Sequence, residues 1–485
     1  MRIDCGSIRA GMNRRQVQLL AATGRRPSDR MSARAIMRKR SGLFLASGAA
    51  MLAASVSCAD AQVIATDQEM VMPPWNAQQV FEPMPLPQLA DPDTREDVAP
   101  EDTPVKTRAY PEYQARGIRA GSWMFNPSLT AGTFYDSNVF SSNFNRRSDV
   151  AGQLGAGLNA QSLWERHGIS IRALTNSTWY RQNPGLDETD ASLKGSGRFD
   201  IDSHTALLGA FQAAYLHEGV GSLSSPAGAV QPTPYSLFGA DLTLRREFGR
   251  LSGSFGGRVD SYDFGSTVAQ NGATIDQGAR SGQVYAAHGR VEYAISGKSA
   301  VFTAGEFNVR DLRGSPGQPL SSDGYRVYSG FALELTRLIR GEIAGGYMAQ
   351  RFDSPSIGTI QGPTYRARLT WSPTRQIDVH FNAEQLVTEA SDTSSTGILA
   401  NALQLGFDYE FRRNVVLSTI GTYEKDSFKG QDRQDNVYAL DAKLKYMLNN
   451  VTSLSFQYRY LRRDSNIPEF SYDKHQVGIN AAARF

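Results

Sequence analysis

The chain ends in the stretch Val477-Gly478-Ile479-Asn480-Ala481-Ala482-Ala483-Arg484-Phe485, in which apolar and other residues alternate up to a terminal aromatic. Successive side chains of a β-strand point to opposite faces of the sheet. One face of this stretch is therefore apolar and the other carries Asn480 and Arg484. The stretch predicts a strand with one apolar face, and a half-buried strand of a soluble sheet would show the same pattern.

The same alternation repeats upstream, and this repetition predicts the fold. The clearest examples are residues 325–335, 365–371, 403–411 and 453–460. Each segment has about 10 to 14 residues, and short polar turns alternate with longer loops between them, as in membrane-spanning barrels. Short turns are predicted at residues 164–168, 202–204, 248–250, 296–298, 338–340, 373–375, 412–414 and 449–450, and long loops at 137–149, 218–233, 265–279, 312–322, 354–362 and 427–434.

No apolar run reaches the roughly 18 residues of a spanning helix. In lipid every backbone N–H and C=O needs an internal partner, which polar strands supply only by closing into a ring. We therefore predict an all-β fold, a transmembrane antiparallel up-and-down β-barrel over residues 120–485, with about eighteen strands and sixteen as the alternative count. An even count puts both ends of the barrel on one side. A secreted solenoid or sandwich is the soluble alternative.

Residues 37–61 have the order of a secretory signal peptide: Met37-Arg38-Lys39-Arg40, a short apolar run, and Ala59-Asp60-Ala61 before Gln62. Residues 1–36 form an extension before it. Both cysteines, Cys5 and Cys58, precede the predicted cut, so we expect no disulfide in the mature chain. Residues 1–61 hold eleven Lys and Arg against three Asp and Glu, and they account for the net charge of +3. The basic balance therefore gives no argument for nucleic acid.

Residues 62–119 are rich in proline and acidic residues, as in Asp91-Pro92-Asp93-Thr94-Arg95-Glu96-Asp97. A segment with so little to bury is expected to be disordered. We interpret it as a periplasmic tether; a plug folded into the barrel is the alternative.

The beginning of the barrel region contains Pro111-Glu112-Tyr113, Gly117-Ile118-Arg119 and Tyr135-Asp136-Ser137-Asn138-Val139-Phe140. It resembles the outer-membrane β-barrel porins of Gram-negative bacteria that are associated with exopolysaccharide or capsule loci, from about Tyr110 to Phe485. The resemblance implies an outer-membrane location with a periplasmic N-terminal segment. It also implies contact with outer-membrane lipid, and with the assembly machinery through Phe485 as its signal. Ser137 stands where such proteins often have a second acidic residue, which weakens a metal-binding pair there.

Enzymatic motifs are absent or unconvincing. Residues 155–160 fit the dinucleotide spacing G-x-G-x-x-A, but they lie within an alternating strand pattern and open no helix. No G-x-S-x-G elbow is present, and the six histidines show no metal-ligand spacing: His167, His204, His217, His288, His380 and His475. We therefore predict no enzyme, no cofactor and no metal site. A serine and a histidine on neighbouring strands could still form a hydrolase, for which His288 and His380 are the candidates.

Charged residues fall on the polar faces of the predicted strands. A barrel of sixteen to eighteen strands leaves an aqueous lumen, and both charge signs in similar numbers favour a path with little charge preference. The alternative is that the charges pair and stiffen a closed wall. The predicted pore-lining residues are Arg326, Glu334, Arg366, Arg368, Asp408, Glu410, Arg412, Asp441, Lys443, Lys445, Arg459 and Arg484.

These observations predict a channel for the passage or export of polar solutes, polysaccharide among them. A structural or adhesive scaffold whose loops bind partners is the alternative, and an outer-membrane hydrolase comes third.

Overall fold

The computed structural model describes residues 104, 105, 108, 110–222, 225–226, 228–315, 319–336, 338–355, 357–388 and 397–485. They belong to one compact unit, Leu52–Phe485. The predicted extension and signal peptide, and most of the predicted tether, lie outside the described residues. No helix within the described part of the chain is long and apolar enough to cross a membrane.

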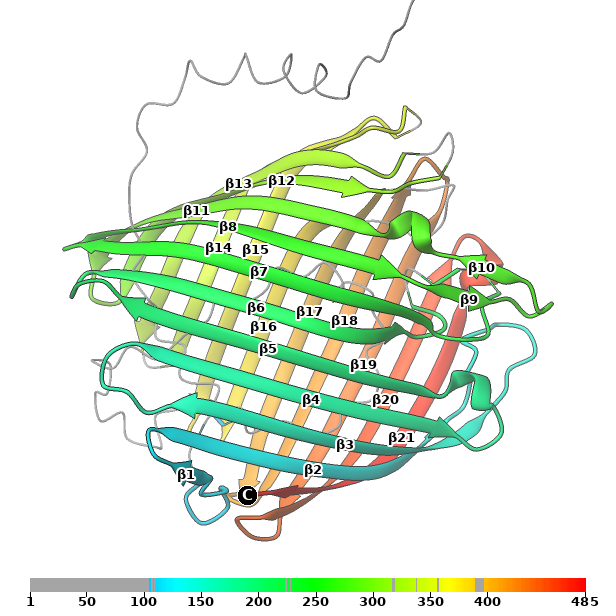
Figure 1. The fold of residues 1–485 in the computed structure, drawn as a ribbon, viewed down its shortest axis with the longest axis horizontal. Helices are drawn as coiled ribbons and strands as arrows, with labels where there is room; N and C mark the ends of the chain where they lie inside the picture. Colours follow the sequence, from blue (N-terminus) through cyan, green and yellow to red (C-terminus); the bar gives the residue numbers. More distant parts are fainter. Residues whose placement is uncertain are drawn as a thin grey trace, which may run out of the picture. The chain divides into compact units, whose positions relative to one another are not determined.

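Eighteen long strands form a closed antiparallel barrel, as predicted (Figure 1). Each strand pairs with the next along the chain, and the first pairs with the last, from Ser128 opposite Arg484 to Asp136 opposite Gln476. The barrel strands are β2 (Trp123–Asp136), β3 (Asp149–Ser162), β4 (Gly168–Tyr180), β5 (Glu188–Asp200), β6 (Thr205–Glu218), β7 (Thr233–Phe248), β8 (Leu251–Phe264), β11 (Gly282–Ser296), β12 (Ser299–Leu312), β13 (Ser322–Thr336), β14 (Ile339–Phe352), β15 (Thr359–Thr374), β16 (Ile377–Thr388), β17 (Gly397–Arg412), β18 (Val415–Lys429), β19 (Gln434–Met447), β20 (Thr452–Ser465) and β21 (Tyr472–Arg484).

The remaining described elements are short. β1 (Ile118–Ala120) pairs with the start of β2, while β9 (Ser266–Val268) and β10 (Thr274–Asp276) form a separate hairpin in a long loop. The 3-10 turn η5 (Gly278–Arg280) follows that hairpin in the same loop, and η4 (Pro184–Leu186) and η6 (Pro468–Phe470) lie in other connections at the same end of the barrel.

Short and long connections alternate along the barrel, which confirms the predicted topology. Residues 249–250, 297–298 and 413–414 turn at one end, which we call the short-turn end. Connections such as residues 137–148, 219–232 and 265–281 lie at the other, the long-loop end. β2 starts and β21 finishes at the short-turn end. The predicted loop at residues 354–362 extends too far, because β15 already begins at Thr359.

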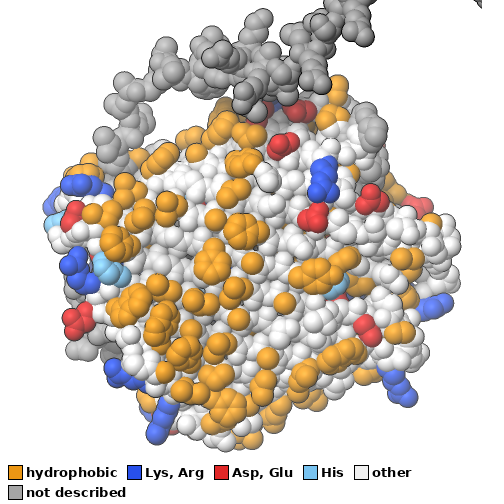
Figure 2. Space-filling model, in the orientation of Figure 1, with side chains coloured by type: hydrophobic (Ala, Val, Ile, Leu, Met, Phe, Trp, Pro, Cys, Tyr) orange, Lys and Arg blue, Asp and Glu red, His pale blue; other side chains and the backbone are white. Residues whose placement is uncertain are grey.

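The outer face of the barrel is apolar. Along β21, Val477 and Ile479 are exposed, with Ile479 58% accessible, while Gln476, Asn480 and Ala482 are buried on the inner side. Figure 2 shows apolar side chains spread across the visible outer wall. Exposed apolar residues of the same kind occur on most other strands, among them Leu129, Leu154, Phe238, Leu242, Phe255, Phe331, Leu405 and Phe456. This surface suits contact with acyl chains, whereas the polar side chains face inward.

Candidate functional site in the barrel lumen

One carboxylate gathers three guanidinium groups near mid-height of the inner wall. Glu384 on β16 accepts hydrogen bonds through Oε1 from Arg326 on β13, at 3.0 Å, and from Arg366 on β15, at 2.6 Å. Its Oε2 lies 3.7 Å from Arg368 on β15, whose side chain stays 60% exposed. The Arg366 and Arg326 guanidiniums also lie against the Tyr328 ring. The Glu384 charge and the Tyr328 ring together hold these arginines in place.

A second group continues this pattern towards β11. Arg290 donates to Glu342 on β14 at 2.8 Å and to Glu292 on its own strand at 2.6 Å, and its guanidinium lies 3.8 Å from the centre of the Phe302 ring. β12 and β13 separate β11 from β14, so these side chains bridge the inner surface of several strands. We call the set of Arg290, Glu292, Arg326, Glu342, Arg366, Arg368 and Glu384 the charged wall.

Neutral polar side chains line another part of the ring, on β2, β3, β20 and β21. By strand order this region lies about opposite the charged wall. The amides and hydroxyls there both donate and accept hydrogen bonds. We call this set the neutral wall, and it consists of Ser128, Thr130, Gln153, Asn159, Ser453, Ser455, Gln457 and Asn480.

Each candidate histidine contacts a threonine hydroxyl, and His380 also contacts an aspartate. His380 on β16 is 2.7 Å from Asp408 through Nε2 and 3.2 Å from the Thr370 hydroxyl through Nδ1. His288 on β11 is 3.0 Å from the Thr243 hydroxyl, which itself donates to an aspartate on β7. These bonds satisfy polar groups of the inner wall. The hydroxyls that contact both imidazoles are threonines, whereas the hydrolase hypothesis rests on a serine.

Residues 219–222, between β6 and β7, fold into the lumen at the long-loop end. The Ser141 hydroxyl donates to the Val220 carbonyl at 3.1 Å, and the Tyr472 hydroxyl donates to the Gly221 carbonyl at 2.6 Å. Arg463 on β20 donates to the Ser222 carbonyl at 3.3 Å. Because β6 and β20 are far apart in strand order, this inner loop must cross part of the lumen to reach β20 and β21.

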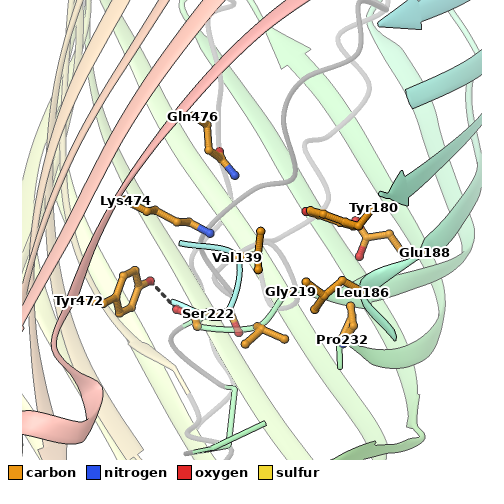
Figure 3. A pocket seen from close by; sticks show the side chains of 12 residues that line it. Val139, Tyr180, Leu186, Glu188, Gly219, Ser222, Pro232, Tyr472, Lys474 and Gln476 are labelled. Atoms are coloured by element: carbon orange, nitrogen blue, oxygen red, sulfur yellow. Dashed lines mark hydrogen bonds between the residues drawn. The ribbon is translucent and has the colours of Figure 1, made fainter. Parts of the chain in front are cut away.

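The inner loop depends on a glycine and leaves a cavity beneath it. Gly221 has φ +81, and a Cβ there would lie 2.1 Å from the Cβ of Ser141. Only glycine fits such a position without strain. Figure 3 shows the cavity between the loop and the wall, with Lys474 and Glu188 among its lining residues. The cavity has a volume of about 50 Å³.

Residues of the segment before β1 bind the inner wall at the short-turn end. The Val105 N–H donates to Asp378 on β16 at 2.5 Å, and the Tyr110 hydroxyl donates to Glu410 on β17 at 2.5 Å. Arg108 forms an ion pair with the same Glu410 and donates to the Arg375 carbonyl. Burial, and then the bond to Glu410, raises the pKa of the Tyr110 hydroxyl. We call this arrangement the mouth contact.

Most of the predicted pore-lining residues share the inner side of their strands. The structure brings Arg326, Arg366 and Arg368 together around Glu384, and pairs Asp441 with Arg459. Arg412 differs, because it follows a register shift after Glu410 and is exposed at a turn. The alternation of burial puts the following on the inner side: Arg326, Glu334, Arg366, Arg368, Asp408, Glu410, Asp441, Lys443, Lys445, Arg459 and Arg484.

Sequence reasoning missed the acidic partners of the charged wall. Glu384 alternates with apolar residues in Val379-His380-Phe381-Asn382-Ala383-Glu384, and Arg290 with Glu292 does so on β11. That signal could have placed them on polar faces. It could not have paired β13 with β16, because the two strands are not adjacent. The cationic role of Arg108 at the mouth had no sequence signal.

The chain matches the family described as putative beta-barrel porin 2 over residues 110–485. No curated protein matches it. Among solved structures, OccK2 (OpdF) of Pseudomonas aeruginosa in complex with glucuronate is 14% identical, with TM-score 0.42 over 74% of this chain and 98% of that one. A BenF-like porin from Pseudomonas fluorescens Pf-5 is 12% identical, with TM-score 0.42 over 74% and 99%. A mutant ferric enterobactin receptor (PfeA) of Pseudomonas aeruginosa is 9% identical, with TM-score 0.41 over 77% and 81%. Such low scores carry no argument about function.

Proposed function

The chain belongs to the putative beta-barrel porin 2 family, and from this premise we propose that it forms a channel through which polar solutes cross the outer membrane. Family and closed barrel together indicate the outer membrane as its location. We also propose that the short-turn end faces the periplasm and that Phe485 is the signal read by the assembly machinery.

The observation that carries the proposal is the polarity of the inner face. The charged wall has four arginines and three glutamates joined by ion pairs, so its field on a passing ion is weak. The neutral wall offers amides and hydroxyls. A lumen with paired charges and exchangeable hydrogen bonds favours hydroxyl-rich solutes over ions of one sign.

Uncharged sugars are therefore the solute class that we propose, and export of a polysaccharide is the narrower form of the proposal. A sugar hydroxyl replaces water at each amide or hydroxyl of the wall without loss of hydrogen bonds. An uncharged sugar also carries no charged group that would have to lose its hydration shell during passage.

The test uses purified, refolded protein in planar bilayers and in liposomes. We expect stepwise conductance with little preference between potassium and chloride, and liposome swelling with mono- and disaccharides. Absence of conductance steps and of swelling, from protein that shows heat-modifiable mobility on a gel, would contradict the proposal.

A closed scaffold is the second candidate, because the inner loop and the mouth contact both occupy space in the lumen. It predicts a folded barrel that does not conduct. The same recordings therefore separate the two functions.

A further inference from the structure

The short-turn mouth of the barrel has a group of inward carboxylates. Asp378 on β16 and Asp408 on β17 are directly paired in register, and Glu410 follows two residues later on the same face. All three are buried. Buried carboxylates this close together repel one another unless cations or donors neutralise them.

The partners of these carboxylates come from two sources. The wall itself supplies His380 to Asp408, at 2.7 Å, and the Ser372 hydroxyl to Asp378, at 2.5 Å. The segment before β1 supplies Arg108 and the Tyr110 hydroxyl to Glu410. A guanidinium and a phenol thus reach one buried carboxylate from residues about 300 positions away in the chain.

The segment is itself buried at this place. Val105 is 3% exposed and its N–H donates to the second oxygen of the Asp378 carboxylate. A backbone donor, a cation and a phenol from one short stretch therefore contact neighbouring strands of the wall. Three donors from one short stretch thus bind acidic side chains of the wall.

We propose that Asp378, Asp408 and Glu410 form a docking site for Val105, Arg108 and Tyr110, which together act as a strap that narrows the short-turn mouth. Release of the strap widens the path for solutes, and Glu410 then loses its contacts with Arg108 and Tyr110. The effect on current rests on the proposed channel function; the docking itself does not.

Charge reversal tests the docking. Arg108→Glu puts two carboxylates together and Glu410→Arg puts two guanidiniums together, so either change should release the strap. The double variant restores an ion pair of opposite polarity and should re-dock it. Arg351→Glu is the matched control, because Arg351 forms an exposed pair with Asp323, at 2.6 Å, near the long-loop end.

Accessibility of residue 105 reports docking without any current. The full chain, with Cys5→Ser and Cys58→Ser, carries Val105→Cys and is treated with a maleimide reagent. We expect labelling at least about tenfold faster in each single reversal than in the parent, which is what the loss of one charged hydrogen bond would produce. The double variant and the Arg351→Glu control should label slowly. Ile118→Cys, at a 54% exposed position, should label fast in every background.

Single-channel conductance is measured on the same variants without the cysteine. Both single reversals should conduct more than the parent, and the double variant should return towards it. Fast labelling of the parent, or no rescue in the double variant, overturns the docking. If fast labelling shows that the strap is released but the conductance is unchanged, the proposed narrowing of the mouth is wrong. If no variant conducts, the proposed function fails while the labelling still decides the docking.

Discussion

Replacing Glu384 by glutamine should make the channel prefer anions. Glu384 is the carboxylate shared by Arg326, Arg366 and Arg368, so the change leaves three guanidiniums without it. The local charge of these four side chains rises by one unit. Glutamine keeps the shape and an acceptor oxygen for Arg326 and Arg366, while its amide nitrogen replaces the oxygen near Arg368.

The size of the effect follows from Coulomb's law. A unit charge about 7 Å from the path of an ion interacts by about 0.6 kcal/mol in water. At about 10 mM salt the screening length is about 30 Å, so most of this energy remains. Chloride gains it and potassium loses it, which gives a difference of about 0.9 kcal/mol, or about fivefold in the permeability ratio.

The assay is the reversal potential across a bilayer with dilute potassium chloride at a tenfold gradient. Asp464→Asn is the control, because Asp464 pairs with Arg462 in an exposed position on β20. It should leave the reversal potential unchanged. At about 1 M salt, where the screening length is about 3 Å, the effect of Glu384→Gln should disappear. An unchanged reversal potential at low salt, with normal conductance, would show that Glu384 does not face the ion path.

Three further changes test the barrel and its inner loop. Ile479→Arg should lower the free energy of unfolding, measured with urea in liposomes, by about 2–4 kcal/mol, because it puts a charge at mid-height of the lipid-facing side. Ile479→Leu should leave the free energy of unfolding nearly unchanged. Equal stability of the two variants would contradict the proposed lipid contact. Tyr472→Phe removes the donor to the Gly221 carbonyl and should increase single-channel current noise at an unchanged fold, whereas unchanged noise would mean that this bond does not hold the loop. Gly221→Ala should lower the unfolding free energy by about 1 kcal/mol or more, since alanine is strained at φ +81; a stability equal to the parent would indicate that the loop relaxes.

The fold was predictable because period-two alternation is a local property. In residues 403–411 and 453–460 the apolar side of the pattern is the outer face of β17 and β20. The alternation of short and long connections gave the parity of the strand count. Turn positions were less accurate near residues 338–340 and 373–375, because register shifts at the adjacent strand ends move the turns by one or two residues.

The candidate site was only half predictable. The side of the wall on which Arg366 lies follows from strand period alone. Its partner does not, because a bond from Arg326 on β13 to Glu384 on β16 depends on barrel stagger and on side-chain length. The inner loop is a further case: a chain reversal at Gly219-Val220-Gly221 can be expected from glycine, but not its contact with Tyr472 across the lumen.

The three features of the lumen act at different heights and on different strands, so their effects should separate. The inner loop contacts β20 and β21 at the long-loop end, the mouth contact involves β16 and β17 at the short-turn end, and the charged wall spans β11 to β16 near mid-height. The two end features occupy space, so a change at either end that keeps its charge should alter conductance and leave ion preference. Neutralising one charge of the charged wall changes the local charge but hardly changes the space that the side chains fill. Such a change should therefore alter ion preference and leave conductance. A charge-conserving variant at one end that shifts the reversal potential as strongly as Glu384→Gln would mean that size and charge are selected at the same place.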